Sequence, residues 1–323
     1  MPCYYPIPCW KPRDWSQYDP KTGKAPMVFR EDLGFPNTKT LIPCGQCIGC
    51  RLARALDWSV RCIHEASQHE KTCFLTLTYS RDNLPEGGSL NKTDIQKFFK
   101  RLRKAHEELQ IRYFQCGEYG DKLHRPHHHV LLFGYDFPDK LPYKFKGNDN
   151  IIYVSKELSQ LWPLGIHAIG ELNQQSASYT CRYILKKQTG EPAEAHYQGR
   201  LPEFTTMSRR PGIGKTWFDQ FKSDLFSHDR CVIRHGFVIP PPDYYDRLYE
   251  LEEPHHLKDL KKSRRSRAKE KEADNTYERL ETKKTIVELK QTRRTRLFET
   301  APESQLDNLL TATYLQHATK PAP

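Results

Sequence analysis

Three consecutive histidines, His127, His128 and His129, begin an apolar run that ends at Gly134. Side chains alternate between the two faces of a β-strand, so His127 and His129 would share one face and His128 would point to the other. Two imidazoles on one face can converge on a metal ion. The alternative for so short a pattern is a set of surface residues on an edge strand.

A carboxylate is placed to complete this candidate metal site. Residues 112–118 and 127–134 predict two strands, and the polar loop between them predicts a hairpin. The hairpin would bring Glu118 to the same end as the histidines. Glu118, His127 and His129 would then form a three-ligand set with open positions for a water or a substrate oxygen. These ligands suit zinc, manganese or other divalent ions, and the spacing does not decide among them.

Two tyrosines downstream are candidate nucleophiles. Tyr179 and Tyr183 are four residues apart in a segment, about 174–188, that is predicted to be helical, so their phenols would share a face that Lys187 continues. A phenol near a metal-polarised phosphate and a lysine can attack phosphorus and hold a strand covalently. The alternative for tyrosines at this spacing is packing in a core or groove.

A cysteine-rich turn precedes a predicted helix. Cys44, Cys47 and Cys50 recur at three-residue intervals, and a tetrahedral structural zinc would need a fourth ligand. Cys3 is one candidate, carried back by a proline-rich arm over residues 1–43. The other candidates for the fourth ligand are Cys9, Cys62 and His64. A turn with packed thiols and no metal is the alternative.

The elements that would position these residues alternate between strand and helix. Strands are predicted at 73–79, 112–118, 127–134 and 165–172. Helices are predicted from about Asn91, with Leu109 on the apolar face, and at 155–161, 174–188 and 217–226. This order predicts an α+β domain whose mainly antiparallel sheet is covered by helices on one face.

Composition indicates the class of partner. A net charge of +11 makes a polyanion the natural partner, and nucleic acid is the first candidate. The segments RLARALDWSVR and FKRLRKAH place basic residues beside aromatic ones, which suits either a single-strand groove or the exposed faces of amphipathic helices. No apolar stretch approaches a membrane span, and the N-terminus lacks a signal peptide, so we expect a cytoplasmic protein whose cysteines are not paired as disulfides.

Three segments carry a family resemblance: FLTLTY, CGEYGDKLHRPHHHVLLFG and SASYTCRYILKK. They resemble the motifs of HUH endonucleases that start rolling-circle replication. With PCGQCIGCR upstream, the chain resembles more narrowly the replication initiation proteins of gokushovirus-type microviruses, small single-stranded DNA phages. The resemblance covers roughly residues 40–190 and the MPCYYP beginning, and it implies an HUH/ferredoxin-like or RRM-like core.

The resemblance implies a role for each candidate residue. His127 and His129 match the metal-binding histidines, Glu118 matches the acidic ligand, and Tyr179 and Tyr183 match the paired catalytic tyrosines. His128 departs from the family pattern, which usually has a hydrophobic or aromatic residue there. Further residues complete the expected site: Lys187 as a catalytic aid, and Arg182 and Lys186 as contacts to DNA.

The resemblance also implies a mechanism. With Mg or Mn bound, a tyrosine would nick single-stranded origin DNA, leaving a 5′-phosphotyrosine and a 3′-hydroxyl primer. The second tyrosine would cleave the regenerated origin, and the displaced strand would be rejoined. The implied partners are the viral origin and host proteins such as a helicase and a polymerase, in the host bacterial cytoplasm and away from membranes.

Four regions are expected along the chain. They are an arm with cysteine knuckle and helix (1–70), an HUH endonuclease core (71–190), a C-terminal extension (191–253) and a basic, helical or disordered tail (254–323). Two other functions stay open at this point. One is a zinc-dependent hydrolase that uses water, and the other is a non-enzymatic basic DNA-binding or packaging protein.

Overall fold

The computed structural model describes residues 3–18, 20, 25–120, 123–143, 151–182, 187–188, 190–233 and 236–299. Its contacts divide the chain into two compact units. The first comprises the described parts of 1–54 and 265–295, and the second comprises those of 55–264 and 296–299. Within the described ranges, no helix combines the length and apolar character that crossing a membrane requires.

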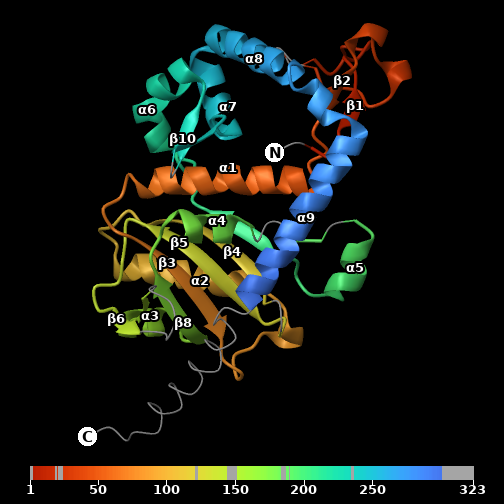
Figure 1. The fold of residues 1–323 in the computed structure, drawn as a ribbon. Coiled ribbons are helices and arrows are strands. Elements are labelled where there is room, and N and C mark those ends of the chain that lie inside the picture. Colours follow the sequence, from red (N-terminus) through yellow and green to blue (C-terminus); the bar gives the residue numbers. More distant parts are fainter. Residues whose placement is uncertain are drawn as a thin grey trace, which may run out of the picture. The chain divides into compact units, whose positions relative to one another are not determined.

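A seven-stranded sheet lies at the centre of the second unit (Figure 1). The strand order is β6–β7–β8–β3–β5–β4–β9, and the neighbouring strands pair antiparallel. The predicted mainly antiparallel α+β fold is therefore confirmed. The strands are β3 (Thr72–Tyr79), β4 (Arg112–Tyr119), β5 (Pro126–Phe133), β6 (Leu141–Tyr143), β7 (Ile152–Val154), β8 (Gly165–Gly170) and β9 (Phe204–Met207).

Helices cover both faces of this sheet. On one face, Leu75 and Leu77 of β3 pack in a core with helices α2 (Lys92–Ala105) and α3 (Lys156–Leu161). On the other, Leu131 of β5 packs in a core with helix α4 (Gln174–Arg182) and with residues 55–66 of helix α1 (Ile48–Ala66). The expectation that helices cover only one face is wrong. Side chains on both faces of β4 and β5 are buried, so these strands do not alternate between buried and exposed residues as a sheet covered on one face would.

Helix α2 begins and ends for identifiable reasons. The Asn91 side chain caps it by accepting a hydrogen bond from the Thr93 N–H at 2.9 Å, as the sequence predicts. Its apolar side, with Phe98 and Leu102, is buried against the sheet. Leu109 was expected on this face, but the helix ends at Ala105 and Leu109 is exposed in the turn that follows.

A third core lies in the later part of the second unit. Phe218 and Phe226 of α6 pack there with Tyr245 and Tyr249 of α7. The predicted helix at 217–226 is thus present and slightly longer. The elements of this part are α5 (Pro192–Tyr197), α6 (Lys215–His228), the antiparallel pair β10 (Cys231–Ile233) and β11 (Phe237–Ile239), α7 (Asp243–Glu252) and α8 (Pro254–Lys269).

The first unit contains the proline-rich arm and part of the basic tail. Within the arm, β1 (Ile7–Cys9) pairs antiparallel with β2 (Thr40–Ile42). The described tail is helical, in α8 and in α9 (Tyr277–Glu299). Lys284 of α9 donates a hydrogen bond to the Tyr5 hydroxyl and lies 5.0 Å from the centre of its ring. The arm is therefore held by strand pairing and by contacts with α9.

Candidate functional site

The β4–β5 hairpin brings the predicted metal ligands together. In its register Glu118 lies opposite His127, and Cys116 lies opposite His129. Residues directly opposite each other in an antiparallel pair point to the same face, so the Glu118 carboxylate meets both imidazoles. Glu118 Oε1 lies 2.6 Å from His127 Nε2 and 3.1 Å from His129 Nε2. The predicted three-residue group is therefore assembled in space, with its ligand atoms within 4.8 Å of one another.

Hydrogen bonds to the far side of each imidazole orient both rings. His127 Nδ1 lies 3.1 Å from the carbonyl oxygen of Arg125, and a carbonyl oxygen can only accept, so Nδ1 carries a proton. His129 Nδ1 lies 3.1 Å from the hydroxyl of Thr76, which is opposite His129 on β3. Both contacts leave Nε2 directed at the shared carboxylate, which is the arrangement of metal-binding histidines in proteins.

The Glu118 carboxylate is held in its ionised form. It is almost wholly buried, and burial raises the pKa of a carboxyl group. The positive charge of His127 and the hydrogen bonds from His127 and His129 more than offset this effect and lower the Glu118 pKa to about 2. One anionic oxygen donor and two imidazoles form a set that fits a divalent cation.

His128 is excluded from the metal site by the alternation of the strand. It is fully buried on the opposite face, where Gln115 approaches its Nδ1 at 3.0 Å and the Tyr79 hydroxyl approaches its Nε2 at 3.3 Å. Burial, together with the charges of His127 and His129, lowers its pKa to about 3. His128 is therefore a neutral core residue, and the pair of converging imidazoles is His127 with His129.

Tyr179 lies beside the metal-ligand group. The Asn173 side chain caps α4 by accepting from the N–H groups of Gln175 and Ser176, at 2.9 and 3.1 Å. The helix then packs through its small buried residues on the same face of the sheet as the metal ligands. The ring of Tyr179 meets the ring of His129 edge to face, with 5.2 Å between their centres. The rings of a candidate nucleophile and of a candidate metal ligand are thus in contact.

Of the other residues predicted near Tyr179, the structure describes only Arg182 and Lys187. Tyr183 and Lys186 lie outside the described residues. The helix was expected to reach residue 188, but Lys187 and Gln188 are not helical, so Lys187 does not continue a helical face. Arg182 is the last residue of α4, and its Nε donates to the Ser178 carbonyl at 3.1 Å.

Arginine in the first basic and aromatic segment has a structural role. Arg61 is 5% exposed, and its guanidinium lies 4.0 Å from the ring centres of both Trp58 and Tyr244. It also donates to the Ile213 carbonyl at 3.1 and 3.2 Å. A groove for single-stranded DNA needs accessible cations, so buried Arg61 serves packing and fits neither alternative for this segment, a DNA groove or an exposed helix face.

Sequence reasoning missed the residues that orient the ligands. Thr76 was assigned to a strand, but the sequence gives no register between that strand and the histidine strand. The carbonyl of Arg125 carries no sequence signal, because every residue has one. The only sequence signal for Thr76 was that it is a small polar residue within a predicted, largely apolar strand.

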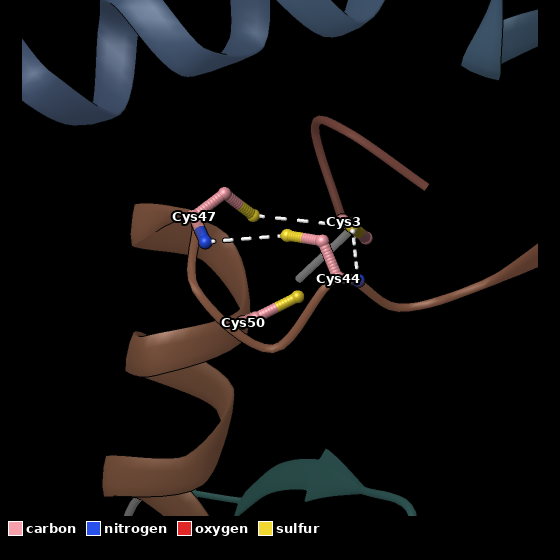
Figure 2. A group of neighbouring side chains, drawn as sticks. All are labelled: Cys3, Cys44, Cys47 and Cys50. Atoms are coloured by element: carbon pink, nitrogen blue, oxygen red, sulfur yellow. Dashed lines mark hydrogen bonds between the residues drawn. The ribbon is translucent and has the colours of Figure 1, made fainter. Parts of the chain in front are cut away.

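A second group of metal-ligating side chains lies in the first unit. Figure 2 shows the sulfur atoms of Cys3, Cys44, Cys47 and Cys50 turned toward one another, and all four lie within 4.8 Å of one another. The fourth member is Cys3. The other candidates, Cys9, Cys62 and His64, do not belong to this group. Burial raises the pKa of the Cys47 thiol, but N–H groups of Tyr4 and Cys50 and the neighbouring thiols outweigh it and lower the pKa to about 6.

Comparisons with known proteins point to one family. Residues 72–188 match a family model described as replication-associated protein ORF2/G2P, and these residues include His127, His129, Glu118 and Tyr179. No solved structure matches the chain.

Three curated relatives are similar over about two thirds of the chain. Replication-associated protein VP4 of Bdellovibrio phage phiMH2K is 33% identical over 220 residues, which cover 66% of this chain and 68% of that protein. Replication-associated protein ORF2 of Spiroplasma virus 4 is 36% identical over 225 residues, which cover 65% of this chain and 68% of that protein. Replication-associated protein ORF4 of Chlamydia phage 1 is 31% identical over 217 residues, which cover 64% of this chain and 53% of that protein. The chain belongs to the family of replication initiation proteins of gokushovirus-type microviruses.

Proposed function

We propose that this protein initiates rolling-circle replication of a single-stranded phage genome by nicking the origin through a tyrosine. The observation that carries the proposal is the edge-to-face contact between Tyr179 and His129, a member of the Glu118, His127 and His129 group. A nucleophile and an electrophile-activating site must lie close together to act on one phosphate. The replication-associated names of the relatives support the same function.

The three-residue group would hold a divalent ion, Mg²⁺ or Mn²⁺, with positions left open for substrate oxygens. Such an ion, when bound, polarises the scissile phosphate and stabilises the charge that develops on it. The role of Thr76 and of the Arg125 carbonyl is to keep each Nε2 directed at the ion. The role of Glu118 is to supply the one negative charge among the three ligands.

The Tyr179 hydroxyl oxygen would attack the phosphorus, forming a bond to phosphorus as the bond to the 3′ oxygen breaks. The phenol loses a proton and the leaving 3′ oxygen gains one, so the reaction exchanges one phosphodiester for another without ATP. The products are a 5′-phosphotyrosine and a 3′-hydroxyl from which a polymerase can extend. Lys187 would assist the loss of the phenol proton.

The remaining steps rest on residues near the end of α4. Tyr183 would act as the second nucleophile, which cleaves the regenerated origin so that the displaced strand can be rejoined. Arg182 and Lys186 would contact the phosphate backbone of the strand. Strand separation and synthesis would be supplied by a host helicase and polymerase.

The test is a covalent-capture experiment with the full-length protein. Circular single-stranded phage DNA carrying internal label is incubated with the protein and Mn²⁺ or Mg²⁺, and the products are separated on a denaturing gel. We expect label to migrate with the protein. Tyr179→Phe combined with Tyr183→Phe should abolish this band, because phenylalanine has no oxygen to bind phosphorus. Tyr277→Phe, at an exposed tyrosine of the first unit, is the matched control and should retain it.

Two outcomes would contradict the proposal. DNA cutting that persists in the double phenylalanine variant would identify a hydrolase that uses water as its nucleophile. DNA binding without cutting, unaffected by loss of His127 and His129, would identify a binding or packaging protein.

A further inference from the structure

The four-cysteine cluster has the dimensions of a tetrahedral thiolate site. Zinc binds a cysteine sulfur at about 2.3 Å, so two sulfurs of one tetrahedron lie about 3.8 Å apart. Cys3 Sγ and Cys47 Sγ are 3.9 Å apart, and all four cysteines are free thiols. A disulfide would need about 2.0 Å between two sulfurs. The spacing therefore corresponds to four ligands around one centre.

Backbone N–H groups point at the sulfurs, as they do around bound thiolates. Cys44 donates to Cys3 Sγ at 3.2 Å and Cys47 donates to Cys44 Sγ at 3.3 Å (Figure 2). The N–H of Tyr4 donates to Cys47 Sγ at 3.4 Å. Donors of this kind stabilise negative charge on sulfur, which a metal ligand must carry. Gly45, at φ +74°, gives the turn a backbone conformation that a side chain would strain.

Strand pairing explains why Cys3 joins the cluster and Cys9 does not. In the β1–β2 ladder Ile7 lies opposite Ile42 and Cys9 lies opposite Thr40. The chain segments beyond the Ile7–Ile42 end of this ladder carry Cys3 before β1 and Cys44 and Cys47 after β2. Cys9 lies farther along the ladder, away from the turn. The arm is thus positioned to deliver one sulfur to a turn that already carries three.

We propose that Cys3, Cys44, Cys47 and Cys50 bind one Zn²⁺ in a closed structural site that fastens the start of the chain to the first turn of α1. Four thiolates fill a tetrahedral zinc and leave no position for a substrate. Soft sulfur ligands select zinc, or iron in an iron–sulfur centre, over Mg²⁺ and Mn²⁺. This site is distinct in ligands and purpose from the group around Glu118, and the proposal does not depend on the nicking reaction.

Metal content of the full-length protein tests the proposal directly. The protein is purified with a non-chelating reductant, dialysed against metal-free buffer and measured by inductively coupled plasma mass spectrometry. We expect one equivalent of zinc, unchanged in Glu118→Gln, which weakens the other ligand group. Cys47→Ser and Cys3→Ser should each lose most of this zinc, whereas Cys9→Ser, at a buried thiol of the same unit, should keep it.

Cobalt substitution keeps the test decisive if a serine variant fails to fold. Co²⁺ bound to the wild-type protein should give the intense thiolate-to-cobalt charge-transfer absorption of a tetrahedral sulfur site. An imidazole and carboxylate site cannot produce this band. Cys3→His should retain the metal with a weaker band, because three cysteines and one histidine also form a structural zinc set.

Three results would overturn the proposal. The first is zinc that is unaffected by Cys47→Ser. The second is iron with the visible colour of an iron–sulfur centre in place of zinc. The third is a disulfide between any two of the four cysteines in protein prepared under reducing conditions.

Discussion

The two groups of metal-ligating side chains differ in how the chain assembles them. Glu118, His127 and His129 lie on adjacent strands of one hairpin, and the register of that hairpin brings them together. The cysteine cluster joins three residues of one turn to Cys3, 41 residues from Cys44. That remote residue lies just before the short two-stranded ladder of β1 and β2.

This difference suggests different tasks. A preformed group of three ligands with open positions suits chemistry, because the ion can bind substrate oxygens. A closed group of four that spans distant segments suits structure, because binding the ion contributes directly to folding. The two should therefore respond separately when either is altered.

The largest expected effect is that of Glu118→Gln on nicking. The variant keeps the size of the side chain but removes the negative charge from the ligand group. Losing several kcal/mol of metal-dependent stabilisation corresponds to a rate reduction of about 1000-fold. Single-turnover nicking of circular single-stranded DNA measures it. Glu171→Gln, at an exposed carboxylate of the same unit, is the control. A loss below tenfold would contradict the role of Glu118 as a ligand, and a loss of zinc from the cysteine cluster would contradict the separation of the two sites.

A smaller effect is expected from Thr76→Val. The substitution removes the hydroxyl that lies 3.1 Å from His129 Nδ1 and leaves a side chain of similar shape. Losing such an orienting contact weakens metal binding by about 10- to 100-fold. Calorimetric titration with Mn²⁺ measures the affinity. Thr72→Val, on the same face at the other end of β3, should bind Mn²⁺ like the wild type, and equal affinities of the two variants would refute a role for Thr76.

The smallest expected effect concerns His128 and acid stability. Burial lowers its pKa to about 3, whereas the unfolded chain takes up this proton near pH 6.5. The unfolded state therefore binds more protons between these values, and stability falls as the pH falls, by at most about 1.4 kcal/mol per pH unit. His128→Phe should remove the contribution of His128 to this pH dependence of stability. The contributions of His64 and His167, whose pKa values burial lowers to about 4, should remain.

Urea unfolding at pH 7, 6 and 5 measures this slope for the wild type and the variant. Gln115 loses a hydrogen-bond partner in His128→Phe, which lowers stability at every pH and does not alter the slope. Nicking should change little, because His128 lies on the face opposite the metal ligands. An unchanged slope would show that His128 takes up its proton at the same pH in the folded and the unfolded protein, which would contradict the lowered pKa.

Local sequence pattern was sufficient to predict much of the fold and the three members of the candidate ligand group. Period-two alternation predicts His127 and His129 on one face and His128 on the other, and a strand has no other way to arrange consecutive side chains. The polar loop before the histidines predicts the hairpin that brings Glu118 to them. Asn91 predicts the start of α2, because a capping side chain acts on N–H groups within three residues.

Only the tertiary structure decided which distant segments meet. The strands β6, β7 and β9 are too short to be recognised from sequence, and the second helical layer follows from burial on both sides of β5. Thr76 reaches His129 through the β3–β5 register, and Tyr179 reaches it through the packing of α4. The β1–β2 pairing selected Cys3 over Cys9 as the fourth thiol. Each of these depends on register and packing between remote residues, which a sequence read residue by residue does not contain.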